Sequence, residues 1–210
     1  MINIQRLVAL GLFLVCGSAL SQTVIEARGV ATQPIVIAEK GKPQACGLRL
    51  VGLDFDESSP KFPAHTMDVR LILARGENPP VIYGVLNTEA RRVKNSAQFR
   101  KGPMAATAMK LNSAWLQSEG GPIQKQLKSG PGDDRLSSIA SYDADHVLSP
   151  LVDMATGAKA LLVGIRSAGE DQARVFRFSN SVPEEHLKQF RECASEMFSQ
   201  IERELSKTSR

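Results

Sequence analysis

The sequence lacks the short motifs that mark the commonest kinds of enzyme site. It has no G-x-S-x-G turn for a hydrolase serine, and no G-x-x-x-x-G-K-[ST] or G-x-G-x-x-G loop for a nucleotide phosphate. Pairs of the form C-x-x-C and H-x-x-x-H are also absent. The sequence therefore predicts no cofactor, and it favours a non-enzymatic protein.

The chain also carries little net charge for its size. It contains 26 Lys and Arg against 22 Asp and Glu, a formal net charge of +4 at pH 7. Arg6 is the only charged residue among the first 21, so a chain beginning at residue 22 has 25 basic and 22 acidic residues, or +3. So small a surplus gives no electrostatic reason to expect nucleic acid as a partner, because nucleic-acid binding usually neutralises many phosphates at once.

Long apolar runs are missing except at the N-terminus. Arg6 precedes the run from Leu7 to Cys16, and small residues then lead to Ser21. This order is typical of a secretory signal peptide, and the run is shorter than the roughly 20 residues that span a bilayer. We expect residues 1–21 to be cleaved, residues 22–210 to form one domain, and the protein to be periplasmic or secreted. A retained membrane anchor is the alternative.

Cysteine is scarce. Cys16 belongs to the predicted signal peptide, which leaves Cys46 and Cys193. Cys46 lies in a pattern typical of a half-buried strand, and Cys193 lies on the apolar stripe of a helical pattern. In an oxidising compartment such a buried pair predicts a disulfide. A redox-active pair would need a C-x-x-C motif, and two free buried thiols are the remaining alternative.

The apolar pattern predicts an α+β fold that is mainly antiparallel β-sheet, with about six or seven strands. Alternating residues predict one hairpin between 66–76 and 81–86 and another between 159–167 and 172–180. Gly52 shifts the apolar phase of the strand that carries Cys46, which predicts a bulge.

Two helices are predicted. Ser149 as a cap and Pro150 in the first turn indicate a short helix near 149–156. A capping box from Ser181 to Glu184 begins a long amphipathic C-terminal helix that packs on the sheet. For residues 105–117 the spacing fits both a helix and a strand.

Asp143, Asp145 and His146 are the most suggestive residues for chemistry. Two carboxylates and an imidazole at this spacing could hold a divalent metal or share a proton, which gives the alternative function, a hydrolase or metal-dependent enzyme. A metal site needs three or four converging ligands, however, and aspartates also favour turns and cap helices. We expect the structural role, so no catalytic residue and no metal ligand is assigned.

Residues 91–101 carry basic side chains with no acidic residue among them: Arg91, Arg92, Lys94, Arg100 and Lys101. On one face these cations would attract an anionic lipid or glycan surface, or an acidic protein. A solvated face without a partner is the alternative.

These observations predict an exported, non-enzymatic binding or accessory protein of the bacterial envelope. Its expected partner is an envelope protein or an anionic lipid or glycan surface. A protein partner would require an exposed apolar patch or an unpaired strand edge on the folded chain. The alternative enzyme would require Asp143, Asp145 and His146 to converge with a further ligand.

Overall fold

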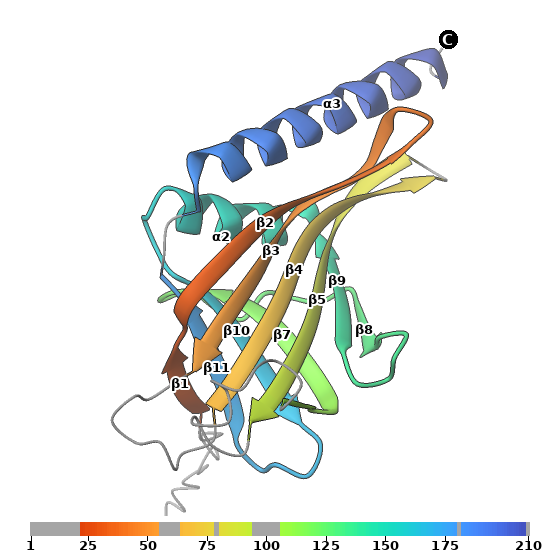
Figure 1. Cartoon of the computed structure of the whole chain (residues 1–210). Coiled ribbons are helices and arrows are strands. Elements are labelled where there is room, and N and C mark those ends of the chain that lie inside the picture. The colour runs from red at the N-terminus through yellow and green to blue at the C-terminus, as the bar shows by residue number, and fades with distance from the viewer. Residues whose placement is uncertain (1–21, 55–63, 78–79, 94–105, 180–181, 209–210) are drawn as a thin grey trace, which may run out of the picture.

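The computed structural model describes residues 22–54, 64–77, 80–93, 106–179 and 182–208. Within these ranges the chain forms two β-sheets and two helices around one hydrophobic core (Figure 1). The larger sheet is antiparallel, and the long C-terminal helix packs on it. The predicted α+β class is confirmed.

The larger sheet has the strand order β2-β3-β4-β5-β9-β8, and the short β6 pairs with β5. The predicted hairpin between 66–76 and 81–86 is confirmed as the antiparallel pair β4 and β5. The strands of the larger sheet are β2 (Arg28–Glu39), β3 (Lys42–Asp54), β4 (Ala64–Glu77), β5 (Pro80–Val93), β6 (Thr107–Ala108), β8 (Lys128–Pro131) and β9 (Ser138–Asp143).

The smaller sheet has the order β1-β11-β10-β7. The strands are β1 (Gln22–Glu26), β7 (Leu111–Ser118), β10 (Leu161–Ser167) and β11 (Ala173–Phe178). The predicted hairpin of β10 and β11 is confirmed, and β1 pairs in parallel with β11. For residues 105–117 the spacing fitted both a helix and a strand. Of the described residues in this range, 107–108 form β6 and 111–117 belong to β7, which pairs antiparallel with β10.

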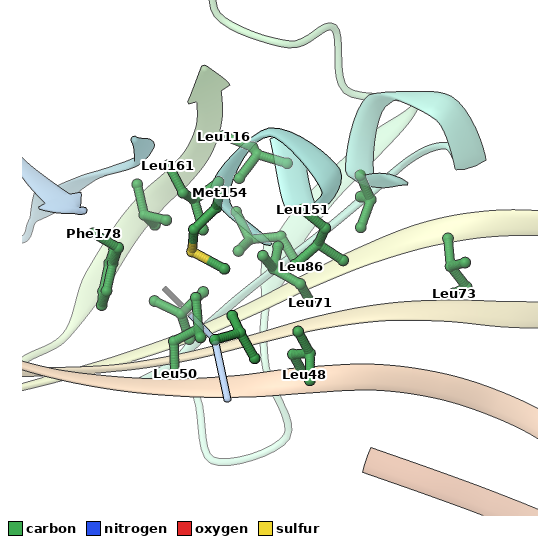
Figure 2. Packing of buried hydrophobic residues seen from close by; sticks show 14 of the residues in the cluster. Leu48, Leu50, Leu71, Leu73, Leu86, Leu116, Leu151, Met154, Leu161 and Phe178 are labelled. Atoms are coloured by element: carbon green, nitrogen blue, oxygen red, sulfur yellow. The ribbon is translucent and has the colours of Figure 1, made fainter. Parts of the chain in front are cut away.

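Helix α2 (Ala144–Ala155) contacts strands of both sheets, and helix α3 (Glu184–Thr208) lies across β2 and β3 (Figure 1). In the core, Leu151 and Met154 of α2 lie between Leu48 and Leu71 of the larger sheet and Leu161 of the smaller one (Figure 2). No described helix combines the length and the apolar character that a membrane span requires.

Cys46 of β3 and Cys193 of α3 form the predicted disulfide, with their Cα atoms 5.8 Å apart. Both are buried, because Cys46 faces the side of the sheet on which α3 packs. The bond links positions 147 residues apart and holds the last helix on an early strand.

The short helix is present, but its predicted start near 149 is wrong. It begins at Ala144, so Ser149 is not its cap and Pro150 lies inside it. Helical geometry from Ala144 onward buries Val147, Pro150 and Met154 on one face. We infer that this burial offsets the backbone hydrogen bond that proline cannot donate. Ser181, the predicted cap of α3, lies outside the described residues.

The bulge predicted at Gly52 lies on the neighbouring strand. The pairing of β3 with β4 runs through Gly52 without a shift, whereas β2 has an irregularity opposite Gly52, between Arg28 and Ala31, and another between Ile37 and Ala38. A Cβ at Gly52 would lie 2.8 Å from Cε1 of Phe178 and 2.9 Å from Cβ of Ala27. Glycine is therefore needed here for close packing between the sheets, and the strand keeps its phase.

Candidate functional site

One face of the larger sheet carries the helices, and the other carries neither of them. Successive side chains of a strand point to opposite faces. On β3, Leu48 and Leu50 point to the inner face, where α2 and α3 pack, and are fully buried. Arg49 and Val51 point the other way, to what we call the outer face. Their cross-strand partners on β2 and β4 share that face because the pairing is in register.

Half of the outer face is apolar. The registers of β2, β3, β4 and β5 place apolar side chains there in adjoining rows, which we call the apolar rows: Ile35, Ile37, Ala45, Ile72, Ala74, Val81, Tyr83 and Val85. Ile37 is 52% exposed and Val81 is 48% exposed, whereas Ala45 is buried and the other residues of the rows are half-buried. Contiguous apolar side chains on a sheet face that no described helix covers are typical of an interaction surface.

The other half of the outer face carries alternating charges, which we call the charged ladder (Arg49, Asp68, Arg70, Glu89 and Arg91). Nε of Arg49 donates to Oδ2 of Asp68 at 2.9 Å, and this hydrogen bonding raises the pKa of Arg49. Nη2 of Arg70 donates to Oε1 of Glu89 at 3.0 Å. Arg91 is exposed and has no ion-pair partner among the residues that the structure describes. The ladder therefore has one cation in excess.

A hollow of about 550 Å³ opens over the charged ladder. The five ladder residues line it together with Ala31, Val51, Leu53, Thr66 and Ala106. Its volume lies within the range of small-molecule sites, roughly 300 to 1,000 Å³. Its walls thus combine apolar side chains with paired charges and with Arg91, which has no ion-pair partner in the part of the chain that the structure describes.

The structure describes two of the five predicted cations of residues 91–101. Arg91 lines the hollow on the outer face, whereas Arg92, the next residue of the strand, points to the opposite face and pairs with Glu170. Lys94, Arg100 and Lys101 lie outside the described residues. Their joint action on an anionic surface stays a prediction.

Arg92 belongs to a polar network that links the two sheets. Its Nε donates to Nε2 of His65 at 3.3 Å, and Nδ1 of this buried histidine lies 3.4 Å from Oδ2 of Asp54. Burial disfavours the charged form of Glu170, but hydrogen bonds and charges of Arg174 and Arg92 outweigh it, so the pKa of Glu170 is lowered. Both ring nitrogens of His65 are engaged, which indicates a structural role for this histidine.

Asp143, Asp145 and His146 lie at the start of α2. Asp143 occupies the N-cap position but makes no side-chain capping bond, and Asp145 is exposed in the first turn. Nδ1 of His146 is buried without a hydrogen-bond partner. Among the described residues, no three His, Cys, Asp or Glu side chains are grouped to hold a metal ion. The hydrolase or metal-dependent enzyme centred on these residues stays a prediction.

Sequence reasoning did not find the charged ladder. The alternation of residues 66–76 does place Asp68 and Arg70 opposite the apolar side chains of their strand. Their partners Arg49 and Glu89 come from other strands, however, and only the register brings them together. Comparison of the chain with protein-family models, with curated proteins and with solved structures finds no match.

Proposed function

We propose that this chain is an exported, non-enzymatic binding protein of the bacterial envelope that holds a partner protein on the outer face of its larger sheet. The observation that supports this function best is the apolar rows. Removing apolar surface from water contributes about 25 cal/mol per Å², so a partner that covers these side chains gains binding free energy.

The edge of the sheet supports the same function. β2 is an edge strand of 12 residues, and no described strand pairs with its free side. Ile37 and Val36 of this strand are both more than half exposed. A long edge with apolar side chains is a site where an extended segment of another protein can add.

Export is supported by two features. The first 21 residues have the order of a signal peptide, and the disulfide between Cys46 and Cys193 suits an oxidising compartment. The test is cell fractionation of the tagged chain, followed by mass spectrometry of its N-terminus. Export predicts a periplasmic or secreted protein that begins at Gln22, and an intact chain in the cytoplasm would contradict it.

The binding face can be tested by photocrosslinking in the envelope. A photoreactive amino acid replaces Val81 of the apolar rows or, as a matched control, Val152 of α2, since these valines are 48% and 49% exposed. We expect a discrete crosslinked protein from position 81 and none from position 152. Ile72→Glu on the same face should abolish the product. Equal products from both positions, or none from position 81, would refute the proposed binding face.

A further inference from the structure

The hollow on the outer face has two chemically different sides. Ala31 of β2 and Val51 and Leu53 of β3 form an apolar side. Arg91 of β5 lies on the other side, and Thr66 of β4 lies between, because Leu53, Thr66 and Arg91 are successive cross-strand partners. Neighbouring strands are about 4.8 Å apart, so the apolar side and Arg91 stand roughly 10 Å from one another.

Among the described residues, the charges within the hollow leave one cation for a ligand. Asp68 accepts hydrogen bonds from Arg49 and also lies 3.7 Å from Nε of Arg70. Glu89 accepts from Arg70. Both carboxylates are thus neutralised by neighbouring guanidinium groups. An anion that enters the hollow meets Arg91 as the charge that no described residue pairs with. A guanidinium can bind a carboxylate or phosphate through two parallel hydrogen bonds.

We propose that the hollow binds a single-chain anionic amphiphile, an alkyl chain that ends in a carboxylate or a phosphate monoester. The head group pairs with Arg91, and the chain lies across β4 against Ala31, Val51 and Leu53. This inference rests on the proposed binding role of the outer face and names a class of ligand for it.

A second hollow gives a comparison within the same molecule. It measures about 290 Å³ and lies between α2 and α3, with Leu151, Leu187 and Phe190 among its lining side chains. Its charged residues, Glu184 and Arg191, form an ion pair with each other. It therefore offers apolar contacts without an unpaired cation, and it should not distinguish an alkyl anion from a neutral alcohol.

The test is a titration of the purified protein with decanoate and decyl phosphate below their critical micelle concentrations and with decanol below its solubility limit, followed by amide NMR and calorimetry. We expect both anions to shift the amide signals of Val51, Thr66 and Arg91. Arg91→Gln should weaken their binding about tenfold, because charge-assisted hydrogen bonds are lost. Lys159→Gln, which removes an exposed positive charge elsewhere, should leave binding unchanged.

Four results would overturn the inference: equal affinity of Arg91→Gln and the wild type, equal affinity of decanol and decanoate, shifts confined to residues around Leu187 and Phe190, or the failure of both anions to bind. Arg91 is exposed, so its variants should keep the wild-type unfolding midpoint, and Arg91→Lys should retain part of the affinity. Crosslinking at residue 81 tests the apolar rows instead, so the proposed binding function and the proposed ligand can each fail without the other.

Discussion

Loss of the disulfide should remove a large share of the stability of this protein. Cys46 and Cys193 are 147 residues apart, and treating the cross-link as loop closure in the unfolded chain gives an upper limit of about 5 kcal/mol. Domains are commonly stable by only about 5 to 15 kcal/mol. Phe190 and Met197 of the apolar stripe of α3 are also buried, so we expect the helix to stay packed on the sheet after reduction. We therefore expect a loss of about 2 to 5 kcal/mol without loss of the fold.

The assay is urea unfolding followed by circular dichroism and by the fluorescence of Trp115, the single tryptophan. Three samples are compared: the oxidised protein, the same protein with excess reductant, and the double variant Cys46→Ala, Cys193→Ala. The reduced protein keeps both sulfur atoms in the core, so its difference from the oxidised protein isolates the cross-link. The double variant also loses sulfur contacts and should be slightly less stable than the reduced protein.

The oxidised protein should also show a smaller m-value, because a cross-linked unfolded chain exposes less surface. The reasoning fails if reduction leaves the unfolding midpoint unchanged. Its premise, the disulfide itself, is wrong if both thiols of the non-reduced protein react with a thiol reagent after denaturation.

Two further substitutions test packing and local electrostatics. Gly52→Ala should lower the free energy of unfolding by about 1 to 3 kcal/mol, because the added Cβ would lie 2.8 Å from the ring of Phe178. Gly130→Ala is the control and should lower it less, since nothing lies within 4 Å of a Cβ there. Equal urea midpoints of the two variants would contradict this. Hydrogen bonds from the backbone and side chain of Ser137 lower the pKa of Asp134 from 3.8 to about 2. Because its pKa is lowered in the folded state, the ionised carboxylate of Asp134 contributes stability above pH 4, and this contribution is lost as the pH falls toward 2. The wild type should therefore exceed Asp134→Asn in urea midpoint at pH 5, with the gap closing toward pH 2, and a gap independent of pH would refute this.

Local patterns were sufficient where the signal lies within one element. Alternation identified β4 with β5 and β10 with β11, because each hairpin pairs neighbours in sequence and its apolar residues share one face. The apolar stripe identified α3 in the same way. The disulfide followed because both cysteines lay on apolar faces of their own elements and an exported chain was expected.

The errors arose where a distant segment decided the outcome. The apolar pattern at Gly52 predicted a bulge in β3. Gly52 is instead needed because the ring of Phe178, from a strand more than 100 residues later, occupies the space of a side chain there. The start of α2 was missed because Pro150 normally marks a first turn, while here the residues before it gain burial between the sheets. No local pattern contains either contact.

The sequence by itself determined the α+β class, the strong hairpins, the long terminal helix and the pairing of its two later cysteines, because periodicity and side-chain chemistry act over a few residues. Tertiary structure alone decided the division into two sheets, the parallel contact of β1 with β11, and the make-up of the outer face. Strand register depends on contacts between residues far apart in the sequence. It places Arg49 beside Asp68 and leaves Arg91 without an ion pair among the described residues. It also aligns apolar side chains from four strands on a face that neither helix covers.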